Sequence, residues 1–229
     1  MRAAVCLVAL ALGLGAALPA LAQVGPTANE VAAYRGLHAA AQRGDVAAID
    51  KLVASGAPLD ARDAQGRTPL HVAAFARQRK AIEALARAGA PLDLLENDRY
   101  DAVTIVSVAD DPQTLALLLQ LGASAKQTTS RYDGTALIAA AHLGHDEVVR
   151  QLIRAGAPLD HVNNLHWTAV IESIVLGDGG PRHQRTLAAL IAAGANLQLA
   201  DRQGHTPLAL SKARGYGDMT RQLVAAGAK

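Results

Sequence analysis

The side chains best suited to chemistry stand together in one short segment of this sequence. His142 and His145 supply imidazole nitrogens, and two carboxylates follow them directly, Asp146 and Glu147. Imidazole and carboxylate groups are common zinc ligands, but a tetrahedral site would need further ligands from elsewhere in the chain. One interpretation is therefore a small-ligand or metal-binding protein that uses His142, His145 and the glycine-rich segment 177–183.

Familiar signatures of catalysis are missing from the chain. It contains no GxSxG, HExxH or GxxxxGK[ST] motif, and no Lys-Ser or Lys-Thr pair follows the glycine-rich segment. The single cysteine, Cys6, falls in an N-terminal segment that we expect to be removed. We therefore predict that the protein is not an enzyme and requires no cofactor.

The charge balance argues against a nucleic-acid partner. The sequence has 22 Lys and Arg residues against 20 Asp and Glu residues, a formal net charge of +2. Proteins that bind nucleic acids concentrate basic residues on one face, and no such concentration is visible here.

Residues 1–22 have the layout of a secretory signal peptide. Arg2 is the only charged residue in this stretch, an alanine- and leucine-rich run follows it, and Ala20-Leu21-Ala22 forms an A-x-A cleavage site. We predict cleavage between Ala22 and Gln23, a short flexible leader over 23–30, and no membrane attachment afterwards. Retention as a membrane anchor is the alternative. The alanine-rich composition and this signal indicate a Gram-negative bacterium, and hence the periplasm.

The rest of the chain repeats itself with a period near 33 residues. Gly-Ala recurs six times, with a leucine four residues before each glycine. The glycines are Gly56, Gly89, Gly122, Gly156, Gly194 and Gly227. Thr-Pro-Leu-His at 68–71 is echoed by Thr-Ala-Leu at 135–137, Thr-Ala-Val at 168–170 and Thr-Pro-Leu at 206–208. Self-similarity at such a period indicates a stack of supersecondary units.

One copy, residues 66–93, shows how each unit is expected to fold. Thr68 is a suitable helix cap, and Pro69 fits the first helical position, where no backbone N–H is needed. A second amphipathic segment follows, and Gly89 then suits the left-handed residue that ends a helix. A single helical pair cannot bury its own apolar face, so each unit needs its neighbours.

In its spacing and motifs the chain resembles the ankyrin repeat family from about Val31 to Lys229. The resemblance implies an all-α solenoid of helix-turn-helix units joined by hairpin-like fingers. We place six repeats at 31–62, 63–95, 96–129, 130–162, 163–200 and 201–229. The finger before the fourth repeat is one residue longer than the others, and five extra residues in the fifth repeat are expected between its helices.

The resemblance implies a non-catalytic scaffold that binds another protein in a concave groove lined by fingers and first helices. We expect a monomer whose partner-binding residues are Arg67, Phe75, Tyr100, Tyr132, Trp167 and His205. Aromatic residues concentrate binding energy at interfaces, and with Tyr34 five of the six aromatic residues fall on this predicted groove. The alternative is that they only shield the stack. His38 and His71 are expected to form structural hydrogen bonds between repeats.

Overall fold

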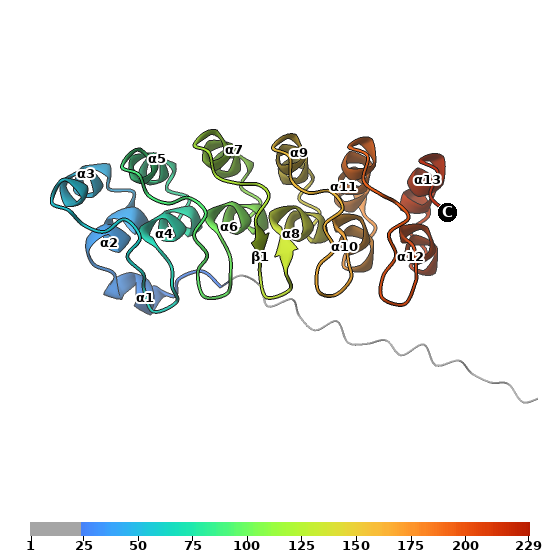
Figure 1. Ribbon diagram of the computed structural model, residues 1–229, viewed down its shortest axis with the longest axis horizontal. Helices are drawn as coiled ribbons and strands as arrows, with labels where there is room; N and C mark the ends of the chain where they lie inside the picture. Colours follow the sequence, from blue (N-terminus) through green and yellow to red (C-terminus); the bar gives the residue numbers. More distant parts are fainter. Residues whose placement is uncertain (1–23) are drawn as a thin grey trace, which may run out of the picture.

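The computed structural model describes residues 24–229 as a single row of stacked helical pairs (Figure 1). One layer contains the inner helices, the first of each repeat: α2 (Gly36–Arg43), α4 (Pro69–Phe75), α6 (Ala102–Val108), α8 (Ala136–His142), α10 (Ala169–Val175) and α12 (Pro207–Ala213). The other contains the outer helices: α3 (Val46–Ala54), α5 (Arg79–Arg87), α7 (Pro112–Gln120), α9 (Asp146–Arg154), α11 (Pro181–Ala192) and α13 (Gly217–Ala225). The predicted ankyrin-type solenoid is confirmed. The signal peptide and its cleavage site, Ala22 and Gln23, lie outside the described residues.

Each inner helix after α2 begins at a side-chain cap. Thr68, Thr135, Thr168 and Thr206 accept a backbone N–H from the third residue beyond them. Asp101 replaces the threonine in the third repeat and does the same for Thr104, at 2.7 Å. A carboxylate and a hydroxyl are interchangeable as helix caps, so the third repeat keeps its helix start despite its divergent sequence.

The Gly-Ala pairs end the outer helices as the sequence indicates. All six glycines have positive φ, from 79° at Gly156 to 97° at Gly122. In every repeat the alanine N–H then donates to the carbonyl of the repeated leucine, as from Ala90 to Leu85 at 3.0 Å. This bond satisfies a carbonyl that the helix end would otherwise leave free.

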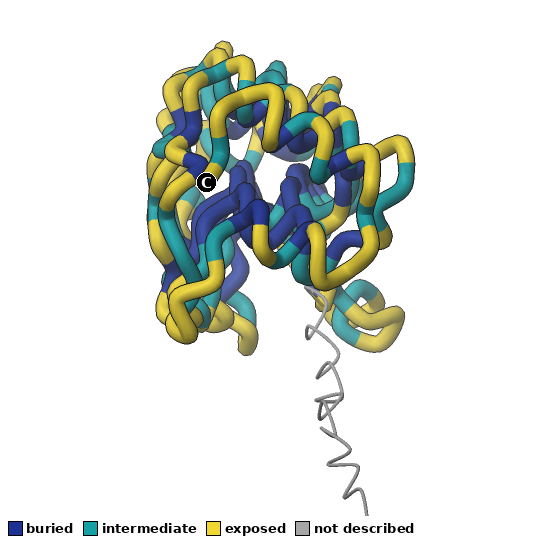
Figure 2. The backbone as a smooth tube through the Cα atoms, turned by 90° about the vertical axis from the view of Figure 1, so that its right-hand side faces the viewer, coloured by how far each residue is buried: buried dark blue, intermediate teal, exposed yellow. Residues whose placement is uncertain are grey.

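The core lies between the two helix layers and is built from the repeated aliphatic residues (Figure 2). The Leu85, Leu118 and Leu152 side chains are fully buried. The last repeat has Thr220 where the others have an aliphatic residue, and its hydroxyl lies 3.0 Å from Ser211 Oγ. The hydroxyl pair gives this polar residue a partner near the end of the stack.

Two expectations about the ends and the insertion were wrong. Residues 28–33, partly within the predicted flexible leader, form helix α1 (Ala28–Ala33), because Thr27 and Glu30 make a capping box. The extra residues of the fifth repeat are not all between its helices. The loop 176–180 has five residues where the same loop has three in repeats two, three, four and six, and α11 has 12 residues where the other outer helices have nine. No helix within residues 24–229 combines the length and apolar character needed to span a bilayer.

Candidate functional site

Five fingers project from the helices, each joining one outer helix to the next inner helix (Figure 1). They span residues 55–68, 88–101, 121–135, 155–168 and 193–206. The third finger is one residue longer, as predicted, and contains the strands β1 (Thr128–Thr129) and β2 (Gly134–Thr135), paired antiparallel. We call the surface formed by the fingers and the last residues of the inner helices the finger face.

A side-chain oxygen holds the tip of each of four fingers. Asp63 Oδ1 accepts the backbone N–H groups of Gln65 and Arg67, and Asp201 does the same for Gln203 and His205. In the other two fingers this position is occupied by Glu96 and Asn163. Side chains that bond the backbone a few residues later fix the shape of a tight turn.

Neighbouring fingers are also bonded to one another. Asn97 N donates to Gln65 O at 3.0 Å, Ser130 N to Arg99 O at 2.8 Å, and Asn164 N to Tyr132 O at 2.9 Å. Arg202 continues the series by donating to Asn164 O at 2.9 Å. The five fingers therefore form one connected edge, and a binding surface held in this way loses little entropy when a partner docks.

Arg67 does not belong to an accessible binding surface, which corrects the sequence-based expectation. Its side chain is 3% exposed and lies 2.7 Å from both Asp63 Oδ2 and Glu30 Oε1. These hydrogen bonds and charges raise the pKa of Arg67 against the effect of its burial, and they lower the pKa of Asp63 in the same way. Helix α1, which the sequence did not predict, supplies Glu30 and helps to cover this site.

Tyr34 and Phe75 are also partly used within the fold. The Tyr34 hydroxyl donates to Asp63 Oδ2 at 2.8 Å, and the residue is only 9% exposed. The Phe75 ring is half-buried, and a Cβ built at Gly25 would lie 3.3 Å from its Cδ1 atom. The segment before α1 thus packs on Phe75. At Tyr34 and Phe75 the structure therefore agrees with the alternative, in which the aromatic residues only shield the stack.

The other predicted binding residues remain on the surface. Tyr100, Tyr132 and Trp167 are half-buried and stand on three consecutive fingers. His205, on the fifth finger, is exposed, and its Nδ1 lies 3.1 Å from Asp201 Oδ2. Tyr100 and Trp167 occupy equivalent positions, each just before the cap of an inner helix, and the intervening finger has Gly134 there.

Two exposed apolar residues on the fourth finger were not singled out from the sequence. Val162 is 44% exposed and Leu165 is 38% exposed, and both lie on the finger that carries Trp167. Exposed turns are usually polar, so two large apolar residues in a predicted finger were the signal that could have identified this site from the sequence. Of the five fingers, the fourth is the one that carries exposed large aliphatic side chains, and they accompany Trp167.

The histidines of the metal-site interpretation are engaged in other contacts. His145 Nδ1 lies 2.9 Å from the Ser107 carbonyl, and His142 Nδ1 lies 3.5 Å from Glu172 Oε2. His183, in the segment 177–183, lies 2.8 Å from Asp178 Oδ1 and 2.9 Å from the His142 carbonyl. Within residues 24–229, no group of three or more His, Cys, Asp or Glu side chains is arranged to hold a metal ion.

The structural role expected of His38 and His71 is confirmed. His38 Nε2 lies 2.9 Å from the Arg67 carbonyl, and His71 Nε2 lies 2.9 Å from Leu94 O and 3.2 Å from Tyr100 O. Each imidazole therefore ties an inner helix to the finger structure of the next repeat. Burial lowers the pKa of His71 to about 4, which keeps its ring neutral at pH 7.

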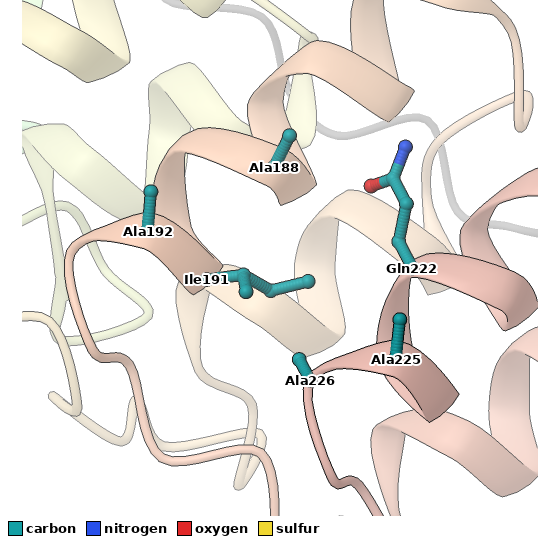
Figure 3. A pocket seen from close by; sticks show the side chains of 6 residues that line it. All are labelled: Ala188, Ile191, Ala192, Gln222, Ala225 and Ala226. Atoms are coloured by element: carbon teal, nitrogen blue, oxygen red, sulfur yellow. The ribbon is translucent and has the colours of Figure 1, made fainter.

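A shallow groove on the outer helices is separate from the finger face (Figure 3). It runs between α11 and α13 and is lined by Ala188, Ile191, Ala192, Gln222, Ala225 and Ala226. None of these side chains titrates near neutral pH, so the groove offers no group for acid–base chemistry or metal binding.

Fold and surface together define a repeat scaffold with a preorganised edge of fingers. Known protein families agree with this class. A family model described as ankyrin repeats (many copies) matches residues 37–86, and one described as ankyrin repeat matches residues 132–164. The ankyrin repeat protein YahD of Escherichia coli (strain K12) is 32% identical over 190 residues, which cover 82% of this chain and 94% of YahD. The chain therefore belongs to the ankyrin repeat family.

Solved structures show the same similarity over most of the chain. An ankyrin repeat domain from Acinetobacter baumannii AYE has 42% identity and a TM-score of 0.80, covering 84% of this chain and 98% of that domain. The ankyrin repeat domain of Bcl-3, a member of the IkappaB protein family, has 27% identity and a TM-score of 0.76, covering 86% and 87%. Ankyrin repeats are generally modules of protein–protein interaction, and proteins of this family are generally non-enzymatic scaffolds.

Proposed function

We propose that this protein is a non-catalytic scaffold that binds a partner protein through its finger face. The observation that carries the proposal is the row of half-buried aromatic side chains, Tyr100, Tyr132 and Trp167, on three consecutive fingers. Aromatic side chains with one accessible face and a polar handle are typical hot spots of protein interfaces. Val162 and Leu165 enlarge the apolar area around Trp167.

The polar residues of the proposed surface are fewer than the sequence suggested. Because Arg67 is buried, we propose that His205 and the tyrosine hydroxyls provide the polar contacts that select the partner. Phe75 contributes only the part of its ring that Gly25 leaves uncovered. The contact area is centred on the fingers 88–101, 121–135 and 155–168. We propose a monomeric scaffold, with no contribution from nucleic acid or from a membrane.

The proposed location is the periplasm, which rests on the signal-like residues 1–22 alone. Cell fractionation with detection of the native chain tests the location, and N-terminal sequencing of the mature protein tests the cleavage. The expected first residue is Gln23. Recovery of the intact chain with Met1 in the membrane fraction would support the retained anchor instead.

Partner capture tests the binding surface. The double variant Tyr100→Ala/Trp167→Ala should lose the partner recovered by the wild type from a periplasmic extract, while its circular dichroism stays helical. Val224→Ala is the matched control, because Val224 is 56% exposed on α13 and lies on an outer helix. Equal recovery with the folded double variant would remove the finger face from the proposal.

A further inference from the structure

A carboxyl group is buried at a position that is apolar in every other inner helix. Glu172, on α10, is 5% exposed. The equivalent positions, four residues after the helix cap, hold Ala39, Val72, Ile105, Ala139 and Leu210. A buried carboxyl at such a site destabilises the fold unless other groups compensate it, so its contacts indicate what it does.

Glu172 is connected directly to the finger that carries Trp167. Asn163 Nδ2 donates to Glu172 Oε1 at 2.9 Å, and Asn163 Oδ1 accepts the backbone N–H groups of Leu165 and Trp167. In the fingers 55–68 and 193–206, the same place is taken by Asp63 and Asp201, whose carboxylates cannot donate a hydrogen bond. The amide of Asn163 therefore links the finger tip to the buried carboxyl.

The groups around Glu172 leave its charge largely uncompensated. In the described part of the chain, the one basic group within 4.0 Å is His142, whose Nδ1 lies 3.5 Å from Glu172 Oε2. Burial, followed by the charges of His183 and His145, lowers the pKa of His142. Burial raises the pKa of Glu172 to about 7, against the opposing effect of its hydrogen bond with Asn163.

The other charged groups on the elements around α10 are occupied or exposed. His183 on α11 bonds Asp178, Arg182 on α11 pairs with Asp110, and Arg185 on α11 pairs with Asp146. His161 on the finger bonds the Asp133 carbonyl, and Lys212 on α12 is exposed. Of these titratable groups, Glu172 is the one that bonds Asn163, and His142 is the one that lies next to Glu172.

We propose that Glu172 and His142 form a proton-binding site beneath the finger 155–168, and that its protonation state sets the position of Trp167. Ionised Glu172 accepts a charge-assisted hydrogen bond from Asn163 and holds the finger tip firmly. Protonated Glu172 accepts a weaker bond, which loosens the tip. The finger is thus a pH-responsive element that changes near neutral pH.

For partner binding the consequence rests on the proposed function. A partner that docks on Trp167 loses less entropy when the finger is held firmly, so it binds preferentially to the form with ionised Glu172. By linkage, such a partner binds more tightly as the pH rises through 7. The pH response of the finger needs no partner. The proposed proton-binding site and the proposed partner binding can therefore be refuted independently.

The test uses the fact that Trp167 is the only tryptophan in the chain. Trp167 emission of the full-length mature protein should change sigmoidally between pH 5.5 and 8.5, with a midpoint near 7. Glu172→Gln, which keeps the shape and removes the titration, should abolish the transition. His166→Asn should keep it, and this control matters because His166 adjoins Trp167 and is exposed.

Two further variants keep the result decisive. If Glu172→Gln does not fold, Glu172→Leu supplies the apolar side chain of Leu210 and should also give flat emission. His142→Asn should shift the midpoint and keep the transition, whereas direct quenching by a charged imidazole would make it vanish. A flat wild-type profile, or a transition that survives in folded Glu172→Gln or Glu172→Leu, overturns the proposal.

Discussion

Arg67 Nη2 lies 2.7 Å from Glu30 Oε1, and this ion pair joins the short helix α1 to the first finger. The same guanidinium holds Asp63 Oδ2 at 2.7 Å, so one buried cation serves two carboxylates. Arg67, which the sequence suggests as a partner contact, therefore stabilises the N-terminal end of the stack.

Arg67→Ala should destabilise the protein rather than alter partner binding selectively. It leaves Asp63 largely buried without its cation, which costs roughly 3–5 kcal/mol of unfolding free energy. Glu30→Ala should cost less, about 1 kcal/mol or below, because Glu30 is 25% exposed. Urea denaturation measures both, with Arg87→Ala, an exposed helix-end arginine, as control. Equal losses for Arg67→Ala and Arg87→Ala would refute the buried network.

Leu118→Ala should weaken the centre of the stack. Leu118 is fully buried in α7, so its truncation should cost roughly 2–5 kcal/mol. Because repeats contact only their neighbours, the loss should be felt on both sides of the third repeat. The matched control is Leu143→Ala at an exposed leucine, for which we expect roughly 0.5 kcal/mol or less. Hydrogen exchange would show whether protection falls on both sides, and a loss confined to α7 would contradict the stacking argument.

Arg77→Gly should be more stable than Arg77→Ala by about 1 kcal/mol. Arg77 has φ of 54° in the turn between α4 and α5, where the turns of three other repeats have Gly44, Gly144 and Gly215. Both variants lose the Arg77 Nη2 bond to Ala109 O, at 2.7 Å, so their difference reports the strain of the left-handed conformation less the entropy cost of ordering glycine. Thermal denaturation of the two variants measures it. A higher melting temperature for Arg77→Ala than for Arg77→Gly would contradict the expected strain.

The His71 contribution to stability should depend on pH. Its pKa is about 4 in the folded protein and near its ordinary value of 6.5 when unfolded. The unfolded state therefore binds the proton more tightly. Neutral His71 makes its full contribution to the free energy of unfolding above pH 6.5, and this contribution is lost as the pH falls towards 4. The full effect is roughly 3 kcal/mol. Protonation would also place a hydrogen on Nδ1, which accepts the Thr68 N–H at 3.1 Å.

The variant His71→Gln tests this sign. Its deficit in unfolding free energy relative to wild type should be large at pH 7.5 and should shrink at pH 5. Glu172 acts in the opposite direction, because its folded pKa of about 7 exceeds its ordinary value of 4.5 and stability falls as the pH rises between them. The comparison therefore uses wild type and variant at each pH, with the exposed His166→Asn as control. A deficit that grows towards pH 5 would reverse the assigned sign.

The sequence by itself determined the repeat, its phase and most helix boundaries. These features depend on local contacts: Thr68 caps its own helix, Gly89 has the left-handed conformation that ends one, and the Ala90 N–H reaches a carbonyl five residues earlier. The aliphatic positions follow from the same period, since each repeat buries the same face against its neighbours. The family assignment and the scaffold class follow from these local rules.

Only the tertiary structure decided which groove residues are accessible. Arg67 and Trp167 occupy equivalent places in the sequence pattern, yet Arg67 is buried and Trp167 is half-exposed. The difference arises because α1 brings Glu30 to Arg67 from 37 residues away, whereas no such helix precedes the fourth finger. Likewise, Glu172 reaches Asn163 only because the finger folds back onto α10. The Glu30–Arg67 and Asn163–Glu172 contacts do not recur from repeat to repeat, so no repeat pattern could have placed them.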